Sequence, residues 1–116
     1  LLADDDASVR DLVARALLAD GHKVHVTQDG AEGLDYLQGN AASVDLLVTD
    51  VDMPQLDGVT LARKAVGLKP GIAIVLMSGF SDQLDRADDV GAKRLVAISK
   101  PFTLEQIRQT VKKCLG

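Results

Sequence analysis

The chain has 116 residues, of which 47% are hydrophobic and 26% charged, and its formal net charge is −4. These values are typical of one soluble globular domain, and we expect a single domain over residues 1–116. The longest apolar stretch, Ile72 to Met77, falls far short of the roughly 18 residues that span a membrane, and an acidic chain binds nucleic acid poorly. With Cys114 as the only cysteine, no internal disulfide can form, so we expect a reducing compartment, the cytoplasm.

Apolar residues alternate or run continuously in some segments and recur with helical spacing in others. The predicted strands are, in chain order, Leu1 to Ala3, His22 to Thr27, Val44 to Thr49, Ile72 to Met77 and Leu95 to Ile98. The predicted helices are Val9 to Leu17, Gly30 to Leu37, the segment through Leu61 and Ala65, Ser81 to Val90, and Thr103 to Leu115. Because the first strand opens at Leu1 without a methionine, we expect that a few residues have been cropped from its start.

Local signals support several of these boundaries. Asp6 or Ser8 can cap the first helix, and Gly21 can end it. Thr103 and Gln106 have the spacing of a capping box at the start of the last helix. The expected core residues are Leu12, Leu17, Leu46, Val75 and Ile107.

Strands and helices alternate along the whole chain. This order predicts an α/β fold in which helices cover both faces of a parallel sheet, with right-handed crossovers. In open sheets of this kind, ligands bind beyond the carboxyl ends of the strands. The topology therefore locates the expected site before any motif is considered.

Residues that can carry chemistry follow four of the five predicted strands. They are Asp4, Asp5 and Asp6 after the first strand, Asp50 after the third, Ser78 after the fourth and Lys100 after the fifth. Each alone has an ordinary explanation as a helix cap, a turn residue or a solvated charge. Their joint occurrence at one edge of a sheet favours a functional site.

The charges of this group indicate what it binds. Two of the early aspartates together with Asp50 and Lys100 sum to −2, which a divalent cation would neutralise. Oxygen ligands without His or Cys nearby favour Mg²⁺, with Mn²⁺ as an alternative, over zinc. Mg²⁺ usually completes its coordination with water and phosphate oxygens, so we expect a phosphoryl substrate. An aspartate is already anionic at pH 7 and can attack phosphorus without a general base.

The residues of the predicted site belong to five motifs that occur in order along the chain. They are Leu1 to Asp6, Leu46 to Asp50, the pairs Met53-Pro54 and Asp57-Gly58, Met77 to Gly79, and Ser99 to Phe102. Together they resemble the receiver domains of bacterial two-component response regulators, the CheY-like family, over essentially the whole chain. The resemblance implies a doubly wound five-stranded parallel sheet with five helices and the flavodoxin-like strand order 2-1-3-4-5.

The resemblance also implies roles for the site residues. Asp50 would accept the phosphoryl group, and Asp5, Asp50 and the backbone carbonyl of Asp52 would bind Mg²⁺ directly. Asp4 would act on the metal through water, Ser78 would donate a hydrogen bond to the phosphoryl group, and Lys100 would pair with it. In the family the peptide bond between this lysine and Pro101 is typically cis.

The partners follow from the same resemblance. A sensor histidine kinase or a histidine phosphotransfer protein would donate the phosphoryl group, and the receiver would catalyse only its own phosphorylation and dephosphorylation. An unidentified downstream protein or output domain would read the change, and phosphorylation could drive dimerisation. We expect no direct contact of this domain with nucleic acid or membrane.

The chain departs from the usual family pattern in two ways. Ala97 stands three residues before the lysine, where receivers usually carry Tyr or Phe that moves inward on activation. Asp52 and Phe80 lie two residues beyond Asp50 and Ser78, at positions that tune access of the hydrolytic water. The sequence therefore suggests a different readout of the switch, and a slower dephosphorylation if Phe80 shields the site.

Three other functions share part of this residue pattern. Asp50 and Asp52 match the nucleophile motif of haloacid dehalogenase-type phosphatases, but the metal-binding acids of those enzymes follow the lysine, where this chain has only Glu105. A flavodoxin-like module would need a phosphate loop where this chain has Asp4 to Asp6. A receiver-like domain that is never phosphorylated is disfavoured because Asp50, Ser78 and Lys100 are all present.

Overall fold

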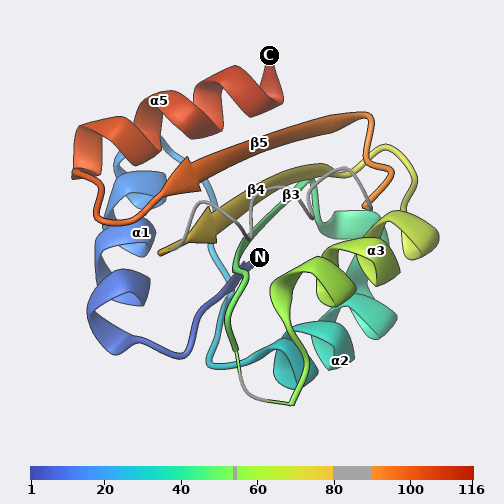
Figure 1. Cartoon of the computed structure of the whole chain (residues 1–116). Coiled ribbons are helices and arrows are strands. Elements are labelled where there is room, and N and C mark those ends of the chain that lie inside the picture. The colour runs from blue at the N-terminus through green and yellow to red at the C-terminus, as the bar shows by residue number, and fades with distance from the viewer. Residues whose placement is uncertain (54, 80–89) are drawn as a thin grey trace.

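Five strands form one parallel sheet in the order β2-β1-β3-β4-β5 (Figure 1), and the chain takes the α/β fold that the sequence predicted. We describe residues 1–53, 55–79 and 90–116 of the computed structural model. The strands are β1 (Leu2–Ala3), β2 (Val26–Thr27), β3 (Leu46–Asp50), β4 (Ala73–Ser78) and β5 (Arg94–Ser99).

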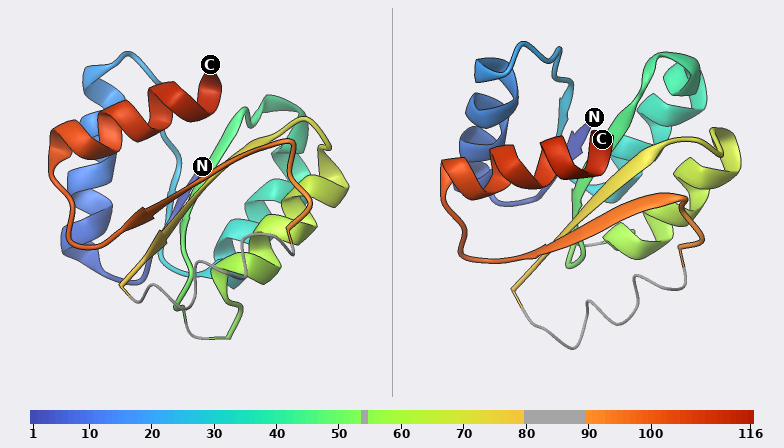
Figure 2. Two further views of the ribbon diagram at one scale, coloured as in Figure 1. Left: turned by 45° about the horizontal axis from the view of Figure 1, so that its top comes forward. Right: turned by 90° about the horizontal axis from the view of Figure 1, so that it is seen from above.

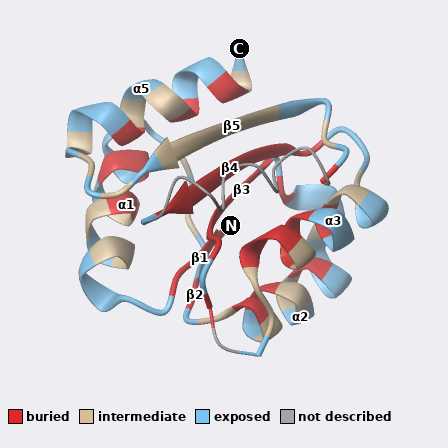
Figure 3. Cartoon of the chain, viewed as in Figure 1, coloured by how far each residue is buried: buried red, intermediate tan, exposed pale blue. Residues whose placement is uncertain are grey.

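The two central strands explain the continuous apolar runs of the sequence. Every residue of β3 and β4 is buried (Figure 3), because helices cover both faces of the sheet at this point. The strands pair in register from Leu46 with Ala73 to Asp50 with Met77. The last residue of β3 is therefore held by hydrogen bonding as well as by packing.

Four α-helices lie in the described residues, two on each face of the sheet (Figures 1 and 2). Helices α1 and α5 cover one face, while α2 and α3 cover the other. The helices are α1 (Ala7–Ala19), α2 (Gly30–Asn40), α3 (Gly58–Leu68) and α5 (Leu104–Leu115), and a short 3₁₀ turn, η1, spans Ala41–Ser43.

The sheet divides the apolar interior into two cores. Successive residues of β4 alternate between them, so Ile74 packs with α2 and α3 while Val75 packs with α1 and α5. Of the predicted core residues, Leu17, Leu46, Val75 and Ile107 are buried. Leu12 is only partly buried, which corrects that prediction; the neighbouring Val13 faces the core instead.

Side chains cap the start of each described α-helix. The carboxylates of Asp6, Asp29 and Asp57 accept backbone N–H bonds at the first turns of α1, α2 and α3. Thr103 and Gln106 form the predicted capping box at the start of α5. Asp6, rather than Ser8, is the cap of α1.

The second strand is shorter than the sequence predicted. The alternation from His22 to Thr27 predicts six residues, but β2 pairs with β1 only at Val26 and Thr27. Both described residues of β1, Leu2 and Ala3, pair with β2. By contrast, β4 and β5 each differ from their predicted ranges by one residue at either end.

One predicted element lies mostly outside the described residues. The expected helix from Ser81 to Val90 falls on residues 81–89, and Phe80 lies outside as well. In the part of the chain that is described, no helix is both long enough and apolar enough to cross a bilayer.

Candidate functional site

The parallel sheet brings the predicted site residues to one edge. Asp4 follows β1, Asp50 ends β3, Ser78 ends β4 and Lys100 follows β5. Asp4, Asp50 and Ser78 are almost fully buried, with relative exposures of 0%, 5% and 1%. Buried polar residues at adjacent strand ends mark this edge as the candidate site.

Three carboxylates converge at this edge. One oxygen from each of Asp4, Asp5 and Asp50 lies within 4.8 Å of the others. Asp5 is exposed and the other two are buried, so the group opens to solvent on one side. Three oxygen donors at this spacing could hold a metal ion.

Lys100 lies between the two buried carboxylates. Its Nζ is 3.1 Å from Asp4 Oδ2, to which it donates a hydrogen bond, and 3.3 Å from Asp50 Oδ2. Its backbone N–H donates to the Ser78 carbonyl at 2.7 Å, and the Lys100–Pro101 peptide bond is cis, as the resemblance implied. Lys100 therefore contacts Asp4 after β1, Asp50 at the end of β3 and Ser78 at the end of β4.

The pKa values of the buried groups reflect this arrangement. Burial, reinforced by the charge of Asp4, raises the pKa of Asp50 to about 6. Burial also raises the pKa of Asp4, against the opposing effects of the Asp6 backbone N–H and Lys100. Burial by itself would lower the pKa of Lys100, but Asp4 and Asp50 outweigh it and the pKa is raised. The two carboxylates therefore lack the positive charge needed to offset their burial.

The remaining predicted acids have separate positions. Asp6 caps α1, and its backbone N–H donates to Asp4 Oδ1 at 2.8 Å, so it supports Asp4. The side chain of Asp52 is exposed and does not join the three-carboxylate group, whereas its backbone N–H bonds Asp50 and opposes the rise of that pKa. At Asp52 the backbone therefore contacts Asp50.

The structure also places two residues at the site that the sequence analysis did not assign to it. Arg10 Nη1 donates to the Asp4 carbonyl at 2.8 Å from one turn inside α1. Gly58, noted only as part of a motif, lies at the start of α3 directly against the Asp50 backbone. The spacing from Asp4 to Arg10 could have suggested the first contact, but only the tertiary packing of α3 reveals the second.

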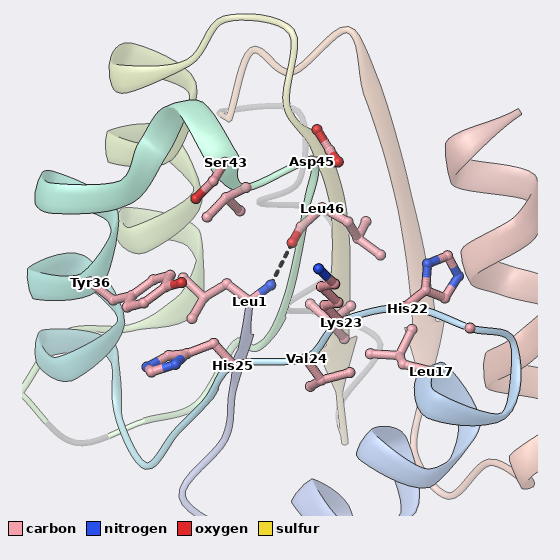
Figure 4. A pocket seen from close by; sticks show the side chains of 13 residues that line it. Leu1, Leu17, His22, Lys23, Val24, His25, Tyr36, Ser43, Asp45 and Leu46 are labelled. Atoms are coloured by element: carbon pink, nitrogen blue, oxygen red, sulfur yellow. Dashed lines mark hydrogen bonds between the residues drawn. The ribbon is translucent and has the colours of Figure 1, made fainter.

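A separate pocket lies at the opposite ends of the strands from the acidic group (Figure 4). It is lined by Leu1, His22, His25, Tyr36 and Asp45 among others, near the beginnings of the strands. The rings of His25 and Tyr36 stack with centroids 3.8 Å apart. Both histidines therefore lie away from the acidic residues.

Glu105, the one acid after Lys100, has partners of its own. It bonds Arg108 and Gln109 along α5 and lies outside the carboxylate group. The metal-binding acids that a haloacid dehalogenase-type phosphatase would need after the lysine are therefore not supplied by this segment.

Comparison with known proteins identifies close sequence relatives. The model of the family described as response regulator receiver domain matches residues 1–112. The receiver protein CpdR of Brucella abortus is 34% identical, and the match covers 99% of this chain and 94% of that protein. The sensor kinase CckA of Brucella abortus is 36% identical, but the chain spans only 12% of its length.

A solved structure agrees with the sequence comparison. The receiver domain of the hybrid histidine kinase CckA superposes with a TM-score of 0.82 and is 32% identical. The match covers 99% of this chain and 96% of that domain. Sequence and fold therefore point to the same family.

Proposed function

Because this chain belongs to the response regulator receiver domains of phosphorelay signalling, we propose that Asp50 is its phosphoryl acceptor. The observation that carries this proposal is the position of the Asp50 carboxylate at the end of β3. It lies 3.3 Å from Lys100 Nζ and within 4.8 Å of carboxylate oxygens of Asp4 and Asp5. A nucleophile, a cation and a metal-binding group thus meet at one point.

The chemistry is a direct transfer to oxygen. A carboxylate oxygen of Asp50 attacks the phosphorus of a phosphohistidine, the new P–O bond forms as the P–N bond breaks, and the imidazole leaves with the electron pair. Lys100 pairs with the incoming phosphoryl oxygens in place of the Asp50 carboxylate. The Ser78 hydroxyl donates a hydrogen bond to the same group. These contacts offset the negative charge that develops during transfer.

The proposed metal-binding residues are Asp4, Asp5, Asp50 and the backbone carbonyl of Asp52, with Asp4 acting through water. Mg²⁺, or Mn²⁺ in its place, would neutralise charge on the phosphoryl oxygens when bound. The proposal is supported by the donor set, which contains only oxygen atoms, and by the raised pKa values of Asp4 and Asp50. Those carboxylates have more negative charge than Lys100 alone balances.

The switch needs a readout without the usual aromatic residue. Ala97 of β5 pairs with Leu76 of β4 and is partly buried against the core on the α2 and α3 side. A methyl group cannot swing into the site as a ring does. We therefore assign the readout to movement of the backbone of Ser78 and Gly79 at the end of β4, which follows when Ser78 is drawn toward the phosphoryl group.

The proposed donors are a sensor histidine kinase or a histidine phosphotransfer protein in the cytoplasm. Support comes from the similarity to the sensor kinase CckA and to CpdR, and from the buried free thiol of Cys114, which suits a reducing compartment. A phosphorylation-dependent dimer and a downstream protein or output domain complete the proposal.

The acceptor is tested by incubating the protein with acetyl phosphate and Mg²⁺ and measuring the intact mass. Wild-type protein and Asp52→Asn should gain one phosphoryl group, whereas Asp50→Asn should gain none. Asp52→Asn is the matched control, because it removes an exposed carboxylate two residues away and keeps the backbone carbonyl. Full labelling of Asp50→Asn would place the acceptor elsewhere. Repeated turnover of small phosphate esters would instead favour a phosphatase.

A further inference from the structure

Helix α2 begins against the loop that follows Asp50. A Cβ atom on Gly30, the first residue of α2, would overlap the carbonyl oxygen of Leu56 and lie 3.0 Å from the Leu56 carbonyl carbon. These are backbone atoms, so no side-chain rotation can relieve the overlap. Any larger residue at position 30 must move either the helix or the loop.

The far end of the same loop is fixed by a similar contact. A Cβ atom on Gly58 would overlap the Asp50 carbonyl oxygen and lie 2.7 Å from its carbon. The Gly58 N–H also donates to the Val51 carbonyl at 2.9 Å. The start of α3 therefore rests on the peptide unit of the proposed phosphoryl acceptor.

Asp52 follows Val51, the residue to which Gly58 is bonded. The loop runs from Asp50, which hydrogen bonding holds in β3, to Gly58, which is tied to Val51. A displacement at Leu56 reaches Gly58, two residues further on, and through the contacts of Gly58 it reaches the backbone of Asp50 and Val51. The backbone of Asp52, already bonded through its N–H to Asp50, is in the path of that displacement.

We propose that Gly30 is a positioning residue for the metal site, although it belongs to α2 and contacts none of the metal-binding carboxylates. Because Gly30 has no side chain, α2 can lie directly against the Leu56 carbonyl. This contact fixes the position of the loop after β3, and hence the position of the Asp52 carbonyl relative to Asp50. This inference rests on the proposed function, because it assigns that carbonyl to Mg²⁺ binding. Residues that orient metal ligands from outside typically change metal affinity by ~10 to 100-fold when they are replaced.

Mg²⁺ titration by calorimetry of wild-type protein, Gly30→Ala, Gly33→Ala and Gly39→Ala tests the proposal. Gly30→Ala should weaken Mg²⁺ binding by about tenfold. Gly39→Ala, in the same helix with no atom within 4 Å of the new Cβ, should bind like wild type. Gly33→Ala presses on the Leu61 side chain at 3.3 Å, so it perturbs the core without touching the loop and should also keep wild-type affinity.

The amide NMR signals of Asp52 and Gly58 provide a second readout without metal. They should shift in Gly30→Ala and stay in place in Gly33→Ala. If Gly30→Ala does not fold, Leu56→Ala, which removes the partly buried side chain of the loop from the core, should weaken Mg²⁺ binding instead.

The outcomes separate the two proposals. Wild-type protein that takes up no Mg²⁺ would overturn the proposed metal site and this inference with it. Wild-type binding together with unchanged affinity in folded Gly30→Ala, or in Leu56→Ala where the first variant is unfolded, would overturn the role of Gly30 alone. Equal weakening in Gly33→Ala and Gly30→Ala would reduce the effect to general destabilisation and also reject it.

Discussion

Asp4 and Asp50 are two buried carboxylates that share one ammonium group. Lys100 reaches both, at 3.1 and 3.3 Å, and cannot neutralise them together. Exposed Asp5 adds a third negative charge at the same edge. An arrangement of this kind works against folding unless a cation or a proton joins it, which explains why the pKa values of Asp4 and Asp50 are raised.

The raised pKa of Asp50 gives a prediction for the metal-free protein. An acid whose folded pKa is about 6, above the ordinary value of 3.8, stabilises the fold fully below 3.8, and this contribution is lost as pH rises through 6. Asp50→Asn mimics the protonated form at every pH. Its free energy of unfolding without Mg²⁺ should match wild type near pH 4 and exceed it by up to ~3 kcal/mol at neutral pH.

Urea denaturation in the presence of a chelator at several pH values measures this difference. Asp35→Asn, which removes an exposed carboxylate from α2, is the control for the change in net charge. A constant difference in free energy of unfolding between Asp50→Asn and wild type across the pH range would show that the pKa of Asp50 is not raised by folding.

The sequence could predict which residues meet at the site but not how they pair. Chain order alone placed Asp4, Asp50, Ser78 and Lys100 at one edge, because parallel strands end together. The contact of Lys100 with both carboxylates depends on the paths of the segments after β1 and β5, which no local pattern encodes. The contact of Gly58 with the Asp50 backbone likewise depends on how α3 packs against the end of β3, which the spacing of apolar residues does not reveal.

At the scale of elements, helix α5 is the one whose start the sequence predicted in most detail. Thr103 Oγ1 accepts the Gln106 N–H at 3.1 Å, and Gln106 Oε1 accepts the Thr103 N–H at 2.8 Å. Thr103→Ala should lower the free energy of unfolding by ~1 kcal/mol, the usual effect of losing an N-cap.

Thr110→Ala is the matched control within α5. Its hydroxyl donates to the Gln106 carbonyl inside the helix, where alanine is a better helix former. Thermal and urea unfolding should therefore show a loss of stability in Thr103→Ala and a gain, or a change close to zero, in Thr110→Ala. Equal losses from both would mean that the capping box adds nothing at this end of α5.

Element lengths show where sequence patterns stop being informative. The predicted strand from His22 to Thr27 was too long because alternation reports one half-buried face, whereas strand length depends on the partner that supplies hydrogen bonds. Among the described strands, β1 is the one that borders β2, and the two pair over two residues. The central strands were predicted well because β3 and β4 are buried on both faces, so composition and pairing agree.

At the scale of the whole molecule, the sheet separates two apolar cores, and its strands end at the surface on two opposite sides. The pocket near Leu1 and His25 lies where the strands begin, and the acidic group lies where they end. The fold therefore supplies stability through its two faces and concentrates unfavourable charge at one end of the strands. Binding a cation there should stabilise the entire domain, because the site draws on β1, β3 and β5 together.

Binding of Mg²⁺ should raise the melting temperature of the whole domain. A ligand at 100 times its dissociation constant stabilises the folded state by ~2.7 kcal/mol, which for a domain of this size raises the melting temperature by roughly 10 °C. Asp5→Asn removes an exposed member of the three-carboxylate group and should abolish most of that rise. Asp6→Asn makes the same change one residue away, but Asn also caps helices well, so α1 should remain capped and the Mg²⁺ response intact. Differential scanning calorimetry with and without Mg²⁺ compares the three proteins, and an equal response in both variants would contradict the assignment of Asp5 to the metal.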